Sequence, residues 1–249
     1  VSGGAPLARE IAEFFYAAGL PILEGYGLTE TSPVITLNTF DDFKFGTVGR
    51  PVPGVEVRIA EDGEICARGP NIMLGYYKKP DLTSEVMKDG WFHTGDIGYL
   101  DEKGFLTITD RKKDIIVTAG GKNIAPQPIE SLLKTSKYID QAVLIGDRRK
   151  FISALVVPNF ENLHAFADAA GVSYQSNSDL IEHKKVFEKI RDEIEEKSQH
   201  LAGFERIKKF ILVEKDFTVE GGELTPTLKV KRKVVENKFR KAIDALYSE

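Results

Sequence analysis

The sequence predicts a mixed α/β chain in two parts, the first rich in glycine and the second rich in long charged helices. Residues 1–109 carry most of the turn signals, such as the runs SGG, EGYG, PVPG and DEKG. Short alternating apolar runs lie between these turns and are typical of strands. From about residue 114 the pattern changes to apolar strands and helical repeats. We therefore expect a boundary at DRKKD, residues 110–114.

The first part is expected to begin with a helix and a buried strand and to continue as a small antiparallel unit. A helical pattern over residues 7–18 precedes PILEGYG, which indicates a strand that runs into a loop. The runs VEVRIA, GEICARG and GFLTITD follow, each bounded by turn residues. Their alternation of apolar and polar residues favours antiparallel strands.

The second part combines a strand pair with helices, which predicts an α+β arrangement. A helix near residues 126–136 precedes the strand-like runs QAVLIGD and FISALVVP. The most periodic helix covers residues 181–200, with Phe187, Ile190 and Ile194 expected on one apolar face. The basic run KVKRK then begins a last helix, whose apolar face is predicted to hold Val235, Phe239, Ala242 and Leu246.

Composition excludes several classes of protein. The 249 residues are 42% hydrophobic and 29% charged, as in ordinary globular chains. A net charge of −4 argues against nucleic acid as the main partner. Cys66 is the single cysteine, so no internal disulfide can form, and a zinc cage is not expected. Because no apolar run spans a bilayer and the start lacks the pattern of a signal peptide, we expect a cytoplasmic protein.

The run EGYGLTETSP, residues 24–33, has a composition suited to a nucleotide. Tyr26 lies between Gly25 and Gly27 and offers a planar face for stacking on a nucleobase. Thr29 and Glu30 add a hydroxyl and a carboxylate, which suit phosphate and Mg²⁺. The alternative is a glycine-containing turn with Tyr26 packed in a core.

A second run, residues 90–126, places Asp96 in a TGD turn and Arg111 fifteen residues later. A carboxylate held by a glycine turn can accept hydrogen bonds from both hydroxyls of a ribose. Taken singly, Asp96 also fits an Asx turn and Arg111 a surface charge.

Four motifs in order extend this interpretation: EGYGLTETSPV, GWFHTGDIGYLDEKGFLTITDRKKDIIV, GGKNIAPQPIE and LTPTLKVKRK. With them the chain resembles the adenylate-forming enzymes, and within these the bacterial long-chain fatty-acid CoA ligases. The resemblance implies that a fatty carboxylate attacks the α-phosphate of ATP, with Mg²⁺, and that coenzyme A then displaces AMP. It also implies a fold: the end of the large AMP-binding domain, with a βα segment and a small antiparallel barrel-like subdomain, then a mobile α+β domain. The implied boundaries are 1–110, a hinge at 111–113, and 114–249.

The resemblance assigns roles by position. The adenine pocket is implied to hold Gly3, Gly4, Ala5, Gly25, Tyr26 and Gly27. Thr29 is implied to contact phosphate, Glu30 to bind Mg²⁺, and Asp96 to hold the ribose beside Arg111. Lys229 corresponds to the lysine of the adenylation step. Lys113 is implied to be the hinge residue, and Gly120, Gly121 and Lys122 to border coenzyme A.

Departures from the family pattern leave alternatives open. Leu228 stands where many relatives carry glycine before the catalytic lysine. The family's phosphate loop has no counterpart here, so we expect a C-terminal fragment that is inactive alone. Activation of a short or aromatic acid, loading of a carrier protein, or a non-enzymatic nucleotide-binding protein remain alternatives. The run KVKRK is either a solvated helix start or a contact with anionic lipid, and the oligomeric state is not predicted.

Overall fold

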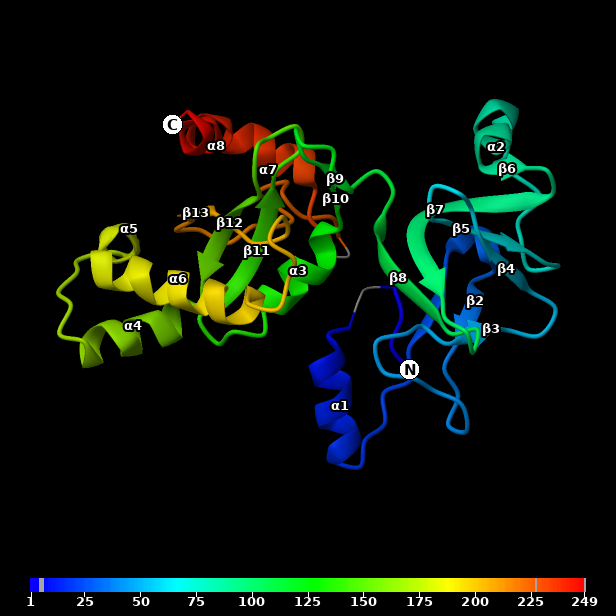
Figure 1. Cartoon of the computed structure of the whole chain (residues 1–249), viewed down its shortest axis with the longest axis horizontal. Helices are drawn as coiled ribbons and strands as arrows, with labels where there is room; N and C mark the ends of the chain where they lie inside the picture. The colour runs from blue at the N-terminus through cyan, green and yellow to red at the C-terminus, as the bar shows by residue number, and fades with distance from the viewer. Residues whose placement is uncertain (5–6, 227, 249) are drawn as a thin grey trace. The chain divides into compact units, whose positions relative to one another are not determined.

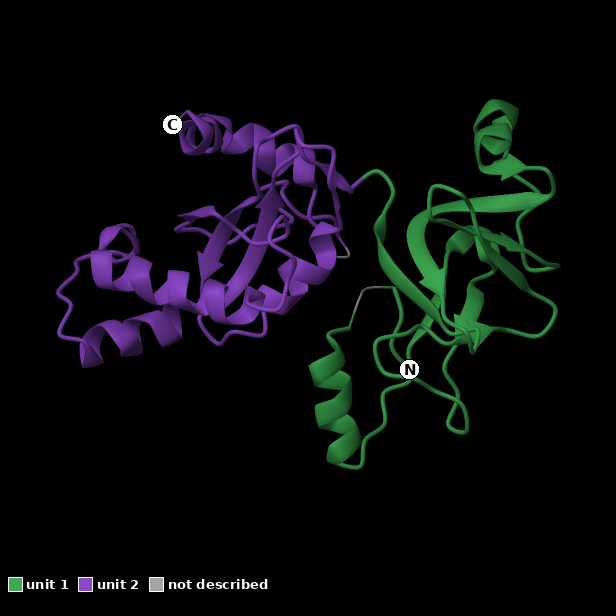
Figure 2. Ribbon diagram, viewed as in Figure 1, with its two compact units in different colours: residues 1–113 green, residues 114–249 purple. Residues whose placement is uncertain are grey.

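The chain folds into two units, residues 1–113 and 114–249, coloured separately in Figure 2 (Figures 1 and 2). The computed structural model describes residues 1–4, 7–226 and 228–248. Ala5, one of the predicted adenine-pocket residues, lies outside this description. Among the described residues, no helix has both the length and the apolar character needed to cross a membrane.

Unit 1 is largely antiparallel sheet, as the alternating runs predict. Its elements are α1 (Arg9–Ala17), β1 (Gly25–Gly27), the short 3-10 helix η1 (Thr29–Thr31), β2 (Val34–Leu37), β3 (Arg50–Pro51), β4 (Glu56–Ile59), β5 (Glu64–Arg68), α2 (Pro80–Val86), β6 (Met87–Lys88), β7 (Trp91–Leu100) and β8 (Leu106–Arg111). One sheet has the order β1-β2-β3. The second has the order β4-β5-β7-β6, with β8 paired to β7, so the curved strand β7 is its central element (Figure 1).

The turns around β7 follow from their residues. Asp89 and Gly90 join β6 to β7 with φ of 52° and 77°, the left-handed pair that a two-residue hairpin needs. The run DEKG joins β7 to β8, where one carboxylate oxygen of Asp101 accepts the N–H groups of Lys103 and Phe105, each at 2.9 Å. This second turn fixes the β7–β8 register that brings Asp96 opposite Arg111.

Unit 2 is an α+β unit around one three-stranded sheet. Its elements are β9 (Ile116–Val117), β10 (Asn123–Ile124), α3 (Pro126–Leu133), β11 (Ile139–Ile145), β12 (Ser153–Pro158), α4 (Phe160–Ala169), α5 (Asn177–Glu182), α6 (Lys184–Ser198), β13 (Lys209–Leu212), α7 (Arg232–Lys238) and α8 (Arg240–Tyr247). The sheet order is β11-β12-β13, antiparallel at the first pair and parallel at the second. The predicted strand pair is therefore present, and β13 adds a third strand that the sequence reading missed.

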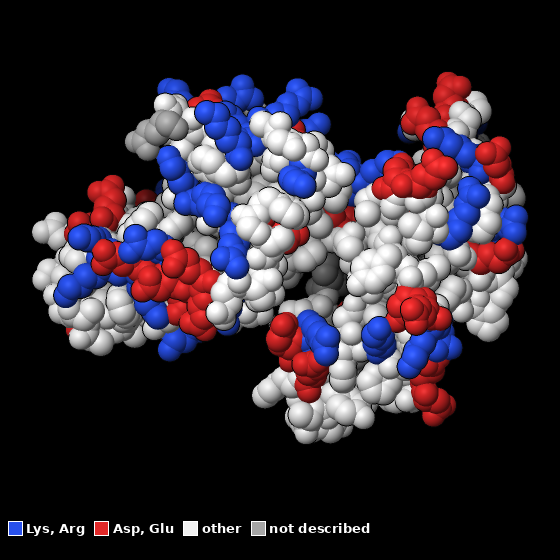
Figure 3. Space-filling model, viewed as in Figure 1, with Lys and Arg blue, Asp and Glu red and all other residues white. Residues whose placement is uncertain are grey.

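Both faces of this sheet are covered, because successive strand residues point to opposite sides. Leu144 and Val156 join a core with α3, α4, α5 and α6, whereas Val143 and Leu155 join a core with α7 and α8. On the side seen in Figure 3, acidic side chains gather over α6 and basic ones at the α7–α8 end of unit 2. Both helical regions thus have a charged outer face and an apolar inner one.

Two predicted helical faces differ in detail. The buried stripe of α6 runs through Val186, Ile190 and Ile194, while Phe187 is 37% exposed. The reason is that α6 starts only at Lys184, after a break at His183, and the i, i+4 repeat from Val186 sets its inner face. The last helix likewise breaks at Phe239.

The inward-facing residues of the C-terminal helix follow an i, i+4 repeat. The Phe239 N–H donates to the Val235 carbonyl oxygen at 3.0 Å, and the Ile243 N–H donates to the Phe239 carbonyl oxygen at 2.9 Å. Ile243 is buried in place of Ala242, which is exposed.

Candidate functional site

Asp96 is the centre of the candidate site in unit 1. It lies on β7 and is only 4% exposed. The Tyr26 hydroxyl donates to one of its carboxylate oxygens at 2.6 Å, and Arg111 Nε lies 3.2 Å from the other. Three predicted residues from β1, β7 and β8 therefore meet at one buried carboxylate.

Strand pairing produces this convergence. In the antiparallel β7–β8 ladder Asp96 is the direct partner of Arg111, so both side chains project from the same place on the sheet. The run TGD lies inside β7 and is not the tight turn that the sequence predicted. Gly95, with φ of 74°, is the left-handed residue of an irregularity in this strand, where the pairing of β7 with β5 shifts register. The fifteen-residue spacing from Asp96 to Arg111 spans the β7–β8 hairpin.

Tyr26 packs in a core, as the alternative interpretation of its motif expects, and stacking on a nucleobase stays a prediction. Its ring packs against a small core of Ile35, Val55 and Ala67, while its hydroxyl reaches Asp96. Burial, with the neighbouring Asp96 charge and hydrogen bond, raises the pKa of Tyr26. The phenol therefore stays protonated as a hydrogen-bond donor and holds the Asp96 carboxylate in place.

The glycines around Tyr26 have a packing reason as well. A Cβ on Gly27 would lie 1.6 Å from the Pro33 carbonyl oxygen, and one on Gly25 would lie 2.9 Å from a methyl of Leu37. Gly3 is close to the same strand, since its Cβ would lie 3.3 Å from the carbonyl oxygen of Gly25. The backbone of β2 therefore excludes larger side chains here, and Gly4, with φ of 84°, completes the turn.

Thr29 and Glu30 form the turn η1 directly after β1. The Glu30 carboxylate accepts the Tyr76 hydroxyl at 2.9 Å, and the Glu30 carbonyl oxygen accepts the Met73 N–H at 2.8 Å. Tyr76 was not predicted, because nothing in the sequence links it to a residue forty-six positions earlier. The turn holds Glu30 partly exposed beside the exposed Thr29.

This arrangement fits a Mg²⁺ ion that is bound mainly by substrate phosphates. Mg²⁺ commonly takes one or two protein carboxylates and completes its shell with phosphate oxygens and water. Within the described ranges, no group of three or more His, Cys, Asp or Glu side chains could hold a metal ion by itself. Glu30, partly exposed next to a hydroxyl, would supply one such carboxylate.

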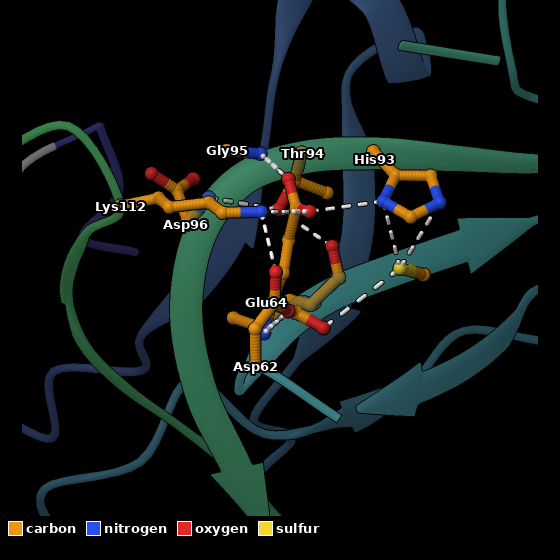
Figure 4. A network of polar contacts seen from close by, with 9 residues as sticks. Asp62, Glu64, His93, Thr94, Gly95, Asp96 and Lys112 are labelled. Carbon is orange, nitrogen blue, oxygen red and sulfur yellow. Dashed lines mark hydrogen bonds and ion pairs between the residues drawn. The ribbon is translucent and has the colours of Figure 1, made fainter. Parts of the chain in front are cut away.

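A network of polar contacts around the buried Glu64 adjoins Asp96 and was not predicted (Figure 4). One oxygen of Glu64 accepts the Gly95 N–H at 2.9 Å, and the other lies 2.9 Å from His93 Nδ1 and 3.0 Å from Lys112 Nζ. Burial by itself would raise the pKa of Glu64, but the hydrogen bonds from His93, Lys112 and Gly95 outweigh it and lower that pKa. An ionised carboxylate can only accept, so His93 Nδ1 carries the proton. Cys66, fully buried, contacts the same imidazole at 3.5 Å.

Lys229 lies in unit 2 on a tight turn before α7. Its backbone N–H donates to Thr225 Oγ1 at 3.0 Å, its carbonyl oxygen accepts the Thr225 N–H at 2.8 Å, and its side chain is exposed. Leu228, just before it, has φ of 59° and is 70% exposed. A left-handed residue at this position explains why glycine is a natural choice there, since a side chain adds strain.

Gly120, Gly121 and Lys122 form the tip of the β9–β10 hairpin. The Lys122 N–H donates to Thr118 Oγ1 at 3.1 Å, and the Gly121 N–H donates to the Thr118 carbonyl oxygen at 2.9 Å. Gly121 has φ of 73°, which requires glycine or strain. Gly120 does not, because a Cβ there would meet only Thr118 Oγ1, at 3.9 Å. The tip is exposed, and Lys122 Nζ lies 5.5 Å from the centre of the Phe204 ring.

Lys113 is the last residue of unit 1 and is exposed. Thus the structure groups Tyr26, Asp96 and Arg111 within unit 1, with Thr29 and Glu30 in the turn that follows Tyr26. Lys229 and the hairpin tip belong to unit 2.

Glu24, one residue before β1, gives a pH-dependent prediction. Burial raises the pKa of Glu24 to about 7, above the ordinary value of 4.5. The folded state therefore holds this proton more tightly than the unfolded chain, so the stabilisation is present below pH 4.5 and is lost as pH rises through about 7. Glu24→Gln is expected to stabilise unit 1 by about 1–2 kcal/mol at pH 8, allowing for partial exposure, and to change little at pH 4.

The measurement is urea unfolding followed by the fluorescence of Trp91, the single tryptophan, which lies in unit 1. Glu61→Gln makes the same chemical change at an exposed position of unit 1 and serves as the control. An equal gain at both pH values would contradict the role of ionisation.

Comparison with known families agrees with these motifs. Residues 1–77 match the AMP-binding enzyme family, and residues 113–249 match the AMP-binding enzyme C-terminal domain. A long-chain-fatty-acid–CoA ligase of Mycobacterium tuberculosis, FadD15, is 46% identical over all of this chain and 42% of its own length. The chain thus spans less than half the length of this curated relative.

Solved structures show the same fold. The adenylation domain of a carboxylate reductase from Mycobacterium chelonae superposes with a TM-score of 0.81 at 24% identity, over all of this chain and 38% of that one. The O-succinylbenzoate coenzyme A synthetase of Bacillus subtilis, solved with ATP and magnesium, gives a TM-score of 0.70 at 26% identity, over 93% of this chain and 44% of that one. The predicted fold class and resemblance are confirmed, and the chain belongs to the AMP-binding enzyme family.

Proposed function

We propose that the protein activates a long-chain fatty acid with ATP, forming an acyl-adenylate and then an acyl-CoA thioester. The observation that carries this proposal is the convergence of Tyr26 and Arg111 on the buried Asp96 carboxylate. A site with a ring face, a carboxylate and a guanidinium suits an adenosine and its phosphate. The 46% identity to a long-chain-fatty-acid–CoA ligase supports the choice of acid.

In unit 1 each site residue contacts a different part of the nucleotide. Tyr26 offers its ring to adenine beside the glycine backbone, Asp96 accepts the ribose hydroxyls, and Arg111 fixes the carboxylate and adds positive charge. Thr29 contacts the phosphate, and Glu30 supplies the carboxylate for Mg²⁺. When bound, this ion would neutralise charge on the phosphates.

In unit 2 one proposed role is a positive charge that moves into the reacting site, and the other is the lining of the coenzyme A channel. Lys229, exposed on its turn, is free to extend its ammonium to the carboxylate and α-phosphate that react. Gly120, Gly121 and Lys122 border coenzyme A, and Lys113 is the hinge between the two arrangements. Domain alternation of this kind lets one pocket serve two half-reactions in turn.

Because the chain spans 42% of the length of FadD15, we propose that catalysis also needs groups from the region of that relative outside the match. We propose that these groups bind the β- and γ-phosphates and form the wall of the acyl pocket. The 249 residues alone are accordingly expected to be inactive. Cytoplasmic location and contact of KVKRK with lipid stay predictions from sequence.

The test of this function is ATP- and coenzyme A-dependent thioester formation by the protein at its natural length. Palmitate, butyrate, benzoate and an acyl carrier protein are compared as acids and acceptors. We expect palmitate and coenzyme A to be preferred. Preference for benzoate or for the carrier protein would instead support another acid-activating reaction, such as those of the structurally similar proteins. No activation of any acid, with AMP still bound, would support a non-enzymatic nucleotide-binding protein.

Gly120→Ala separates the proposed coenzyme A role from folding. Its Cβ meets only ordinary contact in unit 2, so the fold is expected to be unchanged. If pantetheine passes this turn, the added methyl should slow thioester formation by about tenfold or more, because small misplacements near the reacting atoms are costly. Pyrophosphate exchange, which needs no coenzyme A, is the internal control and should not change. Equal thioester rates would remove Gly120 from the channel.

A further inference from the structure

Lys112 is held in two ways to the segment of β7 that carries Gly95 and Asp96. Its backbone N–H donates to the Gly95 carbonyl oxygen at 2.8 Å, and its Nζ lies 3.0 Å from Glu64, the carboxylate that accepts the Gly95 N–H. Gly95 is therefore held on both its N–H and C=O sides by Glu64 and Lys112 (Figure 4). Asp96 follows directly in the chain, so its position depends on this arrangement.

Glu64 is well suited to fix Lys112. Its side chain is 7% exposed, whereas those of Lys112 and Asp62 are 47% and 53% exposed. The pair of Lys112 with Asp62, at 2.6 Å, is a surface ion pair and contributes little. The pair with Glu64 matters more, because removing Lys112 would leave a buried charge less compensated. The hydrogen bonds to Asp62 and then Glu64 raise the pKa of Lys112, so the ammonium stays charged.

The local sequence brings these groups together. In the run EDGE, Asp62 Oδ1 accepts the Glu64 N–H at 3.1 Å, and Gly63, with φ of 83°, completes the turn. Its carbonyl oxygen accepts the Gly98 N–H at 3.0 Å, which fixes the turn against β7. Glu64 thus reaches Gly95 and Lys112 from the neighbouring strand β5.

Lys113, the residue after Lys112, lacks contacts of this kind. Within residues 1–4, 7–226 and 228–248, Lys113 makes no hydrogen bond or ion pair, and the division between the units follows it. The hydrogen bonds that hold the chain to Gly95 therefore end at Lys112. Hinges are commonly a few residues at the end of an element that absorb changes in φ and ψ, and Lys113 is the first residue beyond these hydrogen bonds.

From this geometry we infer that Glu64 is a positioning residue, which clamps Lys112 to the Gly95–Asp96 segment of β7 and so confines bending to Lys113. The inference rests on the proposed function, from which the hinge role of Lys113 comes. Its consequence is that Asp96 and Arg111 keep their relation to the ribose while the chain bends beyond them. Neither Glu64 nor Lys112 touches the substrate in this role.

The test is Lys112→Ala in the protein at its natural length, with Lys112→Arg as the rescuing variant. Hydrogen exchange of the amides of Gly95 and residue 112, which make the two ties, is measured by NMR or mass spectrometry. Both are expected to exchange at least about tenfold faster in Lys112→Ala, while the amide of Leu106, bonded to Gly49 elsewhere in unit 1, stays unchanged. AMP affinity is expected to fall about three- to tenfold, and Lys112→Arg to restore both readouts.

Lys44→Ala is the matched control, because it breaks a lysine–aspartate pair of 2.7 Å with Asp101 in the same unit. This pair does not involve Gly95 or Glu64. It is expected to leave both amides and AMP affinity unchanged. Unchanged exchange in Lys112→Ala, or faster exchange spread evenly over unit 1, would overturn the clamp. Because exchange needs no nucleotide, it judges the clamp even if the wild-type protein fails to bind AMP, which would count only against the proposed function.

Discussion

Asp96→Asn is expected to weaken AMP binding by about 100-fold, the largest effect at the nucleotide site. The change keeps the size of the side chain and an oxygen for the Tyr26 hydroxyl, but it removes the charge that pairs with Arg111. A charge-assisted hydrogen bond contributes about 1.5–3 kcal/mol, and the ribose would lose more than one. Titration calorimetry with AMP measures the effect.

Asp89→Asn is the control for this prediction. It makes the same chemical change at an exposed turn residue of unit 1, where φ is 52° and asparagine is well tolerated. AMP affinity should match that of the wild-type protein. If Asp96→Asn also bound AMP normally, with Trp91 fluorescence showing an intact unit 1, the ribose assignment would be wrong.

Lys229→Ala is expected to lower the rate of acyl-adenylate formation by about 10²- to 10³-fold. Removing a compact positive charge at the reacting phosphate takes away stabilisation that exists mainly in the transition state. Thioester formation from added acyl-adenylate should change little, because the proposed alternation withdraws this lysine in the second half-reaction. Rapid-quench measurement of each half-reaction separates the two effects.

Lys233→Ala, four residues further along and also exposed, removes the same charge from the basic run. It should leave both half-reactions near their wild-type rates. If adenylation survives Lys229→Ala, this lysine does not act in the step. If adenylation falls equally in Lys233→Ala, the general positive charge of the basic run acts, and not Lys229 in particular.

The sequence predicted the elements with strong local signals. The strands around GEICARG and GFLTITD, the helix at Pro126 and the strand pair of unit 2 are present, because alternation and proline or glycine turns define them locally. The strand β13 was missed, since its pairing is parallel and joins Phe210 to Ala154, more than fifty residues earlier. Its four residues carry no local signal that distinguishes a strand from a loop.

The candidate site was likewise only partly predictable from the sequence. Tyr26, Asp96 and Arg111 could be chosen from their motifs, but their meeting at one carboxylate depends on strand register. The partners Tyr76 and Glu64 were missed because a tyrosine or a glutamate in an ordinary run gives no hint of a contact across the sheet. The two glycines beside Tyr26 were interpreted as open space for a base, and the structure adds that β2 backbone packs against them. The assigned roles of the site residues stay predictions.

The most direct test of the central claim is fatty-acid-dependent exchange of labelled pyrophosphate into ATP by the protein at its natural length. Reversible acyl-adenylate formation is the one step that this assay reports, and it needs neither coenzyme A nor a carrier protein. We expect exchange with palmitate and Mg²⁺, little exchange without acid, and loss of exchange in Asp96→Asn and Lys229→Ala. Absence of exchange with every acid tested, in a protein that still binds ATP, would contradict it.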